Sequence, residues 1–313
     1  MTMQLTKTDP GRAQRPHWAP VKRTRPARAD LRACLFALPA LIFIVGVVHY
    51  SLVANGVYST WNWSGVTPSH TPVGGSNYIK LVEDPVFWRS LGNTLVFATL
   101  TVANQMVLGF MLAVLVRTRT RGRGILRTLL FIPVVISPAI VATSFRLLLT
   151  PDGEFNGFLR ALGLDGFAQP WLADPRTALL TLVVINVWQY TGYSFVIYDA
   201  AMAQIDPSVI EAAHLDGAST FGMLRSVIAP LLSGSHLVLI VLGVISALKT
   251  FDLVFLTTAG GPGVETEFLS TYIYRQVITQ FSAGYGAALS VALVVIALVF
   301  AVLQVRLAQK DAH

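Results

Sequence analysis

Two amides and two tyrosines recur at helical spacing in one long apolar segment of the sequence. They are Asn186, Gln189, Tyr190 and Tyr193. Positions i, i+3, i+4 and i+7 share one face of a helix, and this face begins about 14 Å along the helix from Thr177, near the middle of an apolar layer. Amides exchange hydrogen bonds with a hydroxyl-rich solute, and tyrosine rings pack on its C–H faces. The same groups also bond to neighbouring helices, so a solute-binding face and a helix contact remain alternatives.

A polar stretch after this segment carries the signals of a short helix, a turn and a second helix. Asp206 is suited to cap the first helix with Pro207 at its first position, and Gly217 is suited to end it in a left-handed conformation. Between the caps lie small and acidic residues. They are Glu211, Ala212, Ala213 and Asp216. A connection between two apolar segments needs no such order, so the stretch predicts a helix that binds a partner.

Residues that would carry catalysis or ion coupling are scarce in the apolar segments. The titratable ones that stand out are His49, Arg146, Asp199 and His236. No two of them have the spacing of an acid pair or of metal ligands, so packing or interfacial roles are favoured over a proton relay. The sequence contains no HExxH, GxSxG or GxxxxGK[ST] motif. We therefore predict no catalytic residues, no metal site and no ATP bound by this chain, and the single cysteine, Cys34, excludes an internal disulfide.

The composition is that of a membrane protein. Of 313 residues, 54% are hydrophobic and 12% are charged, and the mean hydropathy is +0.61. Soluble chains carry about 25% charged residues, so this chain has too few charges for a wetted surface. A nucleic-acid-binding role is excluded despite the net charge of +7, which we attribute to membrane topology and contact with anionic lipid.

Six segments are long and apolar enough to cross a membrane as helices. They run approximately over residues 35–58, 91–116, 125–149, 177–199, 227–248 and 286–307. We therefore expect an all-α polytopic protein with six transmembrane helices. Fifteen Lys and Arg residues fall in the tails and in the second and fourth loops, against six in the other three loops. Because positive loops stay in the cytoplasm, both termini are expected there.

Three regions follow from this pattern. Residues 1–33 form a basic cytoplasmic tail, residues 34–85 hold the first transmembrane helix and an outer loop rich in proline and glycine, and residues 86–308 hold the other five helices. A boundary is expected near residue 86.

Several motifs together resemble those of binding-protein-dependent ABC importer permeases of the carbohydrate type, whose members include maltose and glycerol-3-phosphate permeases. The polar stretch near 204–222 is similar to the EAA loop of that family. The matching residues are Glu211 to Ala213, Asp216 to Ala218, Ile228 to Pro230, Thr258 to Pro262, Thr266, Tyr272 to Tyr274 and Gly284 to Ser290. The resemblance covers about residues 86–305 and implies a type I ABC importer permease fold.

The resemblance also implies the machinery around the chain. A second homologous permease subunit, two cytoplasmic ATP-binding subunits that bind ATP and Mg, and an extracytoplasmic solute-binding protein are its expected partners. The complex would lie in a bacterial or archaeal plasma membrane. In the family the EAA loop contacts the ATPase, which assigns the coupling role here to Glu211, Ala212, Ala213, Asp216 and Gly217.

The solute pathway that the resemblance implies includes the face first identified by spacing. To Asn186, Gln189, Tyr190 and Tyr193 it adds Ser246, Lys249 and Thr250. We expect a carbohydrate as the solute, with glycerol-3-phosphate or a glycerophosphodiester as the alternative, because Lys249 is suited either to meet a phosphate or to pair with Asp252 or lipid. A more distant alternative is an ion-coupled secondary carrier, which would need an ion site at mid-membrane.

Overall fold

A computed structural model describes residues 31–118 and 122–310, and the described chain is almost entirely helical, as predicted. It consists of two units, Met1–Leu52 and Val53–His313. Most of the predicted basic tail lies outside the described residues, as do Arg119 and Arg121 of the second loop.

The described part of the first unit, from Leu31, is one apolar helix whose last residues belong to the second unit. It comprises α1 (Leu31–Phe43), a π-helical segment (Ile44–His49) and the start of α2 (Tyr50–Tyr58). The span Phe36–Tyr58 agrees within one residue with the predicted one. Its large apolar side chains are exposed, which is typical of a helix whose surroundings are lipid.

The second unit starts with a small hairpin. Strand β1 (Trp61–Trp63) pairs antiparallel with β2 (His70–Pro72), with Trp61 opposite Pro72. Helix α3 (Ser76–Glu83) follows. The hairpin packs against the start of α15 (Ala283–Lys310), where a Cβ atom at Gly284 would lie 1.9 Å from the Trp61 carbonyl oxygen. Glycine is therefore required at this contact.

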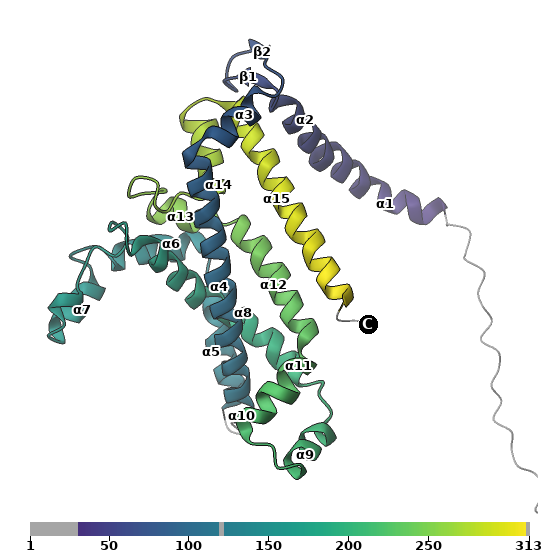
Figure 1. Ribbon diagram of the computed structural model, residues 1–313, viewed down its shortest axis with the longest axis vertical. Helices are drawn as coiled ribbons and strands as arrows, with labels where there is room; N and C mark the ends of the chain where they lie inside the picture. Colours follow the sequence, from purple (N-terminus) through teal and green to yellow (C-terminus); the bar gives the residue numbers. More distant parts are fainter. Residues whose placement is uncertain (1–30, 119–121, 311–313) are drawn as a thin grey trace, which may run out of the picture. The chain divides into compact units, whose positions relative to one another are not determined.

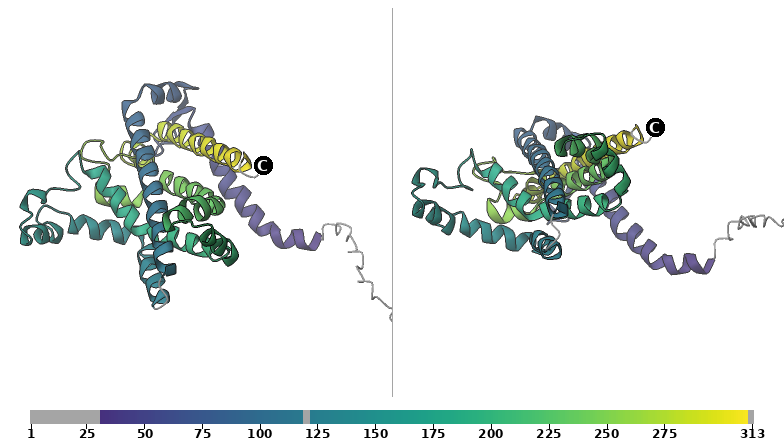
Figure 2. Two further views of the ribbon diagram at one scale, coloured as in Figure 1. Left: turned by 60° about the horizontal axis from the view of Figure 1, so that its bottom comes forward. Right: turned by 90° about the horizontal axis from the view of Figure 1, so that it is seen from below.

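Helix α4 (Pro85–Thr118) is the central helix of this unit. It packs along α8 (Ala178–Met202), and also on α12 (Ser233–Leu248), as Figure 1 shows. Close approach of α4 and α8 depends on Gly109, because a Cβ atom there would lie 2.6 Å from Cβ of Ser194. Helix α15 runs beside α12 in the further views (Figure 2). The spans Pro85–Arg117, Ala178–Met202 and Ala283–Gln304 confirm three more predicted crossings.

The two remaining predicted spans are each formed by two helices with a sharp bend between them, so the chain has up to six crossings, as predicted, when each bent pair counts as one. The third consists of α5 (Arg123–Val135) and α6 (Pro138–Leu148), bent by 89°. Proline disfavours the helical conformation in the residue before it, and Ser137 is accordingly extended, with ψ of 133°. The fifth consists of Thr220–Leu231 and Ser233–Leu248, bent by 69° just after Pro230, which lacks a backbone N–H.

Shorter elements join these helices. They are α7 (Glu154–Ala161), a 3₁₀ turn (Asp165–Phe167), α9 (Pro207–Leu215), α10 (Thr220–Met223), a π-helical segment (Leu224–Ile228), α11 (Ala229–Leu231), α13 (Asp252–Thr257), α14 (Leu269–Tyr274) and a second π-helical segment (Arg275–Thr279).

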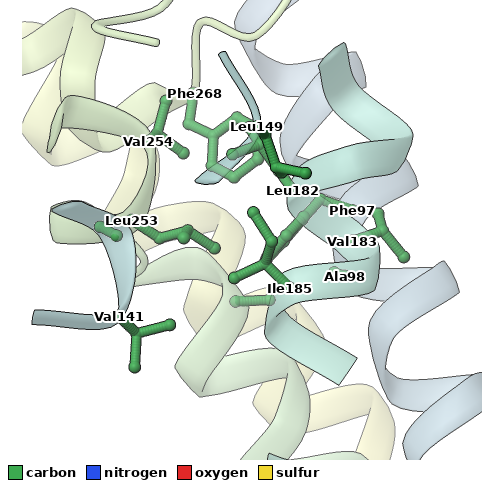
Figure 3. Close-up of a cluster of buried hydrophobic side chains, with 12 residues drawn as sticks. Phe97, Ala98, Val141, Leu149, Leu182, Val183, Ile185, Leu253, Val254 and Phe268 are labelled. Atoms are coloured by element: carbon green, nitrogen blue, oxygen red, sulfur yellow. The ribbon is translucent and has the colours of Figure 1, made fainter. Parts of the chain in front are cut away.

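Buried apolar clusters hold the second unit together at several levels. One joins Phe97 of α4 to Leu182 and Ile185 of α8 and to Val254 of α13, as Figure 3 shows. Another lies around the end of α8 that leads to α9 and includes Ala213 of α9 itself. The predicted boundary near residue 86 stays a prediction, although the compact unit begins earlier, at Val53, because β1 and α3 pack on α15.

Candidate functional site

A cavity of about 330 Å³ lies between α4, α8 and α12. Three of the residues predicted on one face of α8 line it, namely Asn186, Tyr190 and Tyr193. Ser246 and Thr250, predicted from the resemblance, line the same cavity from α12 and the turn after it. The structure thus brings five of the seven predicted pathway residues around one space, and every residue that lines it is uncharged.

Helix α4 adds two polar residues to this cavity that the sequence analysis missed, Thr101 and Gln105. The Gln105 Nε2 donates to Oδ1 of Asn186 over 2.9 Å and also approaches the Asn186 carbonyl oxygen at 3.3 Å. One side of the Asn186 amide therefore bonds to a neighbouring helix, while the residue still lines the cavity. The i, i+4 spacing of Thr101 and Gln105 in an apolar span is the signal that could have identified them.

A second cavity of about 520 Å³ adjoins the first and shares several lining residues with it. It contains the two charged candidates, Lys249 and Asp252, both exposed. Within the described residues these two side chains form no ion pair with each other. The suggested Lys249–Asp252 pair is thus absent from the described structure, and both charges are accessible in the cavity.

Gln189 has a different environment from the rest of its helical face. It also lines the second cavity, but it is buried, and its Nε2 donates to the carbonyl oxygen of Ile136 over 3.0 Å. Ile136 lies in the break between α5 and α6. Helix breaks leave carbonyl groups without helical partners, so Gln189 satisfies one of them and fastens the bend to α8.

Helix α9 has the ends that the sequence predicts. The Asp206 side chain accepts a hydrogen bond from the Ser208 N–H over 2.9 Å, and this bond holds the pKa of Asp206 below its usual value. Pro207 is the first helical residue. At the other end Gly217 has φ of 76°, and the Ala218 N–H donates to the carbonyl oxygen of Ala213, as in a Schellman motif.

The side chains of α9 divide into a buried and an exposed set. Ala213 is buried against the cluster at the end of α8. The other predicted coupling residues are exposed, namely Glu211, Ala212, Asp216 and Gly217. Of the two alanines, therefore, only Ala212 is available to another surface, since neighbouring residues on a helix point in different directions.

Two exposed apolar side chains beside these residues were not singled out from the sequence. Leu215 is 89% exposed at the end of α9, and Phe221 is 71% exposed in α10. Leu215 lies just before the C-cap of α9 and Phe221 lies in the four-residue helix α10, where hydrophobic periodicity is too short to show which side a residue faces. Apolar side chains exposed outside the apolar spans, beside an ordered helix, are available for a contact with another protein.

A buried carboxylate stands at the α9 end of α8. Asp199 is 7% exposed and pairs with three arginines from α4 and α5. The Arg117 Nε lies 3.3 Å and the Arg123 Nη2 lies 2.9 Å from Oδ1, and Arg127 contacts Oδ2. This cluster confirms the predicted packing role of Asp199.

At the opposite end of the second unit, Asp84 accepts hydrogen bonds from the hydroxyls of Tyr272 and Tyr285, the latter over 2.6 Å. Burial raises the pKa of the Asp84 carboxyl, but these bonds and the Val86 N–H outweigh burial and hold the pKa below its usual value. Burial and the hydrogen bond to Asp84 together raise the pKa of Tyr272 to about 12. The motif residues Tyr272 and Tyr285 thus fasten α14 and α15 to the start of α4.

The Thr258 to Pro262 motif shapes a loop at this same end. The Thr258 and Thr266 hydroxyls are 2.7 Å apart, and Thr266 donates to the carbonyl oxygen of Gly261 over 2.6 Å. Among the described residues no group of three or more His, Cys, Asp or Glu side chains is arranged to hold a metal ion.

Known proteins share this sequence and fold. A protein of Pyrococcus horikoshii that bears the name Probable ABC transporter permease protein is 35% identical over 266 residues, covering 85% of this chain and 91% of the relative. A lactose transport system permease protein of Rhizobium radiobacter is 32% identical over 279 residues, covering 88% of this chain and 93% of the relative.

A bacterial alginate ABC transporter, solved with a periplasmic protein bound to an alginate pentasaccharide, contains a chain of the same fold. The TM-score is 0.79 at 24% identity, and the match covers 90% of this chain and 95% of the other. The family model of binding-protein-dependent transport system inner membrane components matches residues 105–311. The chain therefore belongs to this family of membrane permeases.

Proposed function

We propose that this chain is one permease subunit of an ATP-driven ABC importer and that it carries a carbohydrate through the cavity between α4, α8 and α12. The observation that carries the proposal is the uncharged polar lining of that cavity. Neutral amides and hydroxyls suit the hydroxyl groups of a sugar. The names of relatives that transport lactose and alginate support the same class of solute.

The cavity requires a second chain to enclose a solute. Tyr193 lines it and is 40% exposed, so the cavity opens on the surface of this chain. A second, homologous permease would close that side. An extracytoplasmic binding protein would deliver the solute, and two ATP-binding subunits would hold ATP and Mg, while this chain would perform no covalent chemistry.

The α9 end of the second unit would face the cytoplasm. Arg117, Arg123 and Arg127 gather at that end, and positive charge favours the cytoplasmic side of a membrane. With an even number of crossings, six when each bent pair counts as one, both termini would lie in the cytoplasm of a bacterial or archaeal cell. The exposed, capped α9 would then contact the ATPase.

A movement of α9 would be transmitted to the helices that line the cavity. Closure of two ATPase subunits around ATP would displace α9, which is continuous with α8 on one side and, through α10 and α11, with α12 on the other. Both α8 and α12 line the cavity. A displacement of α9 would therefore change the access of the solute to the two sides of the membrane.

A phosphate-bearing solute is the second candidate, because Lys249 is exposed in the adjoining cavity and lacks a carboxylate partner within the described residues. Asp252 lines that cavity too and would repel an anion. The uncharged first cavity favours the carbohydrate.

The test uses the assembled complex of both permeases and the ATPases in lipid, with its binding protein. ATP hydrolysis is measured with lactose, maltose, trehalose, glycerol-3-phosphate and a glycerophosphodiester in turn. Stimulation by a sugar supports the proposal, and stimulation only by the phosphate compounds selects the second candidate. A complex whose uptake persists without ATP and stops on adding an uncoupler would show an ion-coupled carrier instead.

A further inference from the structure

Two adjacent buried residues near the α9 end of α8 make polar contacts in different directions. Tyr198 points toward α12, where its hydroxyl lies 2.6 Å from Nδ1 of His236. Asp199 points toward α4 and α5, where it meets the three arginines described above. Consecutive helix residues are about 100° apart, so one helix turn fastens α8 on two sides.

The direction of the hydrogen bonds at His236 follows from its second contact. Its Nε2 lies 3.0 Å from the carbonyl oxygen of Ala229, which can only accept. The Nε2 therefore carries the proton, and in the neutral ring Nδ1 accepts from the Tyr198 hydroxyl. His236 thus bridges Tyr198 of α8 to Ala229 of α11, across the 69° bend of the broken span.

This bridge joins the two ends of one segment of the chain. Residues 203–232 leave α8, pass through α9, α10 and α11, and enter α12. Tyr198 lies just before that segment and His236 just after it. A displacement of α9 reaches the rest of the protein through these two ends and through the buried cluster that contains Ala213, and the bridge connects the two ends directly.

Few other contacts connect α8 with α12 in this structure. Helix α12 packs mainly on α4 and α15, and the cavity of about 330 Å³ separates much of its length from α8. The Tyr198–His236 hydrogen bond therefore lies where a direct link between the two cavity-lining helices would have the largest effect on how they move.

We infer that Tyr198 and His236 are positioning residues that make α8 and α12 move together when α9 is displaced. The Asp199 cluster holds the same turn of α8 to α4 and α5, which provides the support for this movement. The inference rests on the proposed coupling role of α9 and adds how its motion reaches both walls of the cavity.

The experiment measures distances between spin labels in the assembled complex in lipid, with cysteine-free partner subunits. Cys34→Ser removes the single native cysteine. Labels at Ser208 of α9 and Leu147 of α6 form one pair, and labels at Val238 of α12 and Leu147 form the other; all three positions are exposed. Each pair is measured without nucleotide and after trapping with ATP, Mg and orthovanadate.

Three variants and one control separate coupling from stability. Tyr198→Phe and His236→Leu remove the bridge, whereas His236→Gln keeps an amide donor for Ala229 and an acceptor for Tyr198. The matched control is Tyr78→Phe, which removes another tyrosine hydroxyl contact, 2.7 Å from Ser59, at the opposite end of the unit. Thermal unfolding of every complex is measured alongside.

We expect trapping to shift both pairs in the wild-type complex and in Tyr78→Phe. In Tyr198→Phe and His236→Leu the α9 pair should still shift, while the shift of the α12 pair falls by about half or more. His236→Gln should restore it. An α12 shift of wild-type size in both bridge-removing variants, even with a lowered melting temperature, would overturn the inference and leave the proposed function standing. A wild-type complex whose α9 pair does not respond to trapping would contradict the proposed function and this inference together.

Discussion

The carboxylates at the two ends of the Val53–His313 unit have different kinds of partners. At the α9 end, three arginines surround one buried carboxylate, Asp199. At the other end, charges are matched one to one, Arg275 with Glu267 and Arg89 with Glu265, and Asp84 is held by tyrosine hydroxyls. The Asp199 cluster therefore carries excess positive charge, and between the two ends the first cavity is lined by uncharged residues.

The two ends of this unit and the cavity between them therefore differ in charge and in the interactions that they can make. Positive charge near one end favours one orientation in the membrane, ion pairs and tyrosine hydroxyls hold the carboxylates at the other end, and the cavity offers hydrogen bonds without fixed charge. The α9 end also exposes a capped helix with apolar neighbours. If the two ends and the cavity are independent, substitutions in one of them should leave the properties of the others unchanged.

The largest effect is expected from Gly217→Pro. Gly217 has φ of 76°, and its N–H donates to the His214 carbonyl oxygen over 3.1 Å. Proline requires a negative φ and has no N–H, so the end of α9 would be lost at a cost of about 3 kcal/mol or more. We expect the permease to insert normally and to lose solute-stimulated ATP hydrolysis, measured on the assembled complex.

Gly163 provides a matched control for that change. It follows α7 with φ of 74°, and its N–H donates to the Arg160 carbonyl oxygen over 2.9 Å, so the local geometry is the same at a helix outside the α9 segment. Gly163→Pro should leave co-purification of the ATPase intact. Normal solute-stimulated hydrolysis in a well-expressed Gly217→Pro complex would remove α9 from the coupling path.

The next largest effect is expected from Asp199→Asn. Removing one partner of a buried ion pair leaves the other charge uncompensated and destabilises a protein by about 3–5 kcal/mol. Because the three arginines are partly exposed, we expect the loss of folding stability here to be about 3 kcal/mol. Thermal unfolding of the complex should shift down accordingly. Glu265→Gln removes the partner of an exposed pair and should cost about 0–1 kcal/mol. Equal shifts in the two variants would contradict the difference between the ends.

The sequence predicted most where the deciding residues are neighbours in the chain. Asp206, Pro207 and Gly217 fix the ends of α9 through local backbone geometry, and hydropathy alone located the four continuous spans. The bends were missed because a hydropathy window is insensitive to direction. The Gln105–Asn186 bond joins residues 81 positions apart, and so depends on how helices pack.

The same reasoning explains why only part of the predicted face on α8, Asn186 to Tyr193, lines the first cavity. Helical spacing correctly placed Asn186, Tyr190 and Tyr193 together in a cavity. It did not reveal that Gln189 bonds to the α5–α6 break, because that break depends on Ser137 and Pro138 in another helix. Likewise Asp199 attracts attention in the sequence, but its partners come from two other helices.

A smaller effect should follow acidification, through Asp84. The folded state holds the pKa of Asp84 below the ordinary value of 3.8, so its contribution to stability is complete above that value and is lost as the pH falls through the folded pKa. Hydrogen bonds to a charged group contribute about 1.5–3 kcal/mol. Asp84→Asn should lower the melting temperature at neutral pH and flatten its decline in acid, measured between about pH 5 and pH 3. A variant that declines as steeply as wild type would assign the acid sensitivity to other carboxylates.

The smallest effects are expected in the neutral cavity. Removing one uncharged hydrogen bond costs about 0.5–1.5 kcal/mol, which is about a twofold to tenfold loss of affinity. Asn186→Ala and Tyr193→Ala should raise the half-saturating solute concentration. The control Val184→Ala should not, because Val184 is exposed on another face of α8 and lines neither of the two cavities that Asn186 lines. Gln105→Ala should reproduce part of the Asn186 effect because it releases that amide.

Half-saturation and melting temperature are measured on the same preparations, since residues that only join helices would lower the melting temperature and leave half-saturation unchanged. Unchanged half-saturation in both Asn186→Ala and Tyr193→Ala would remove this face from the pathway and direct attention to Ser246 and Thr250 on the opposite wall.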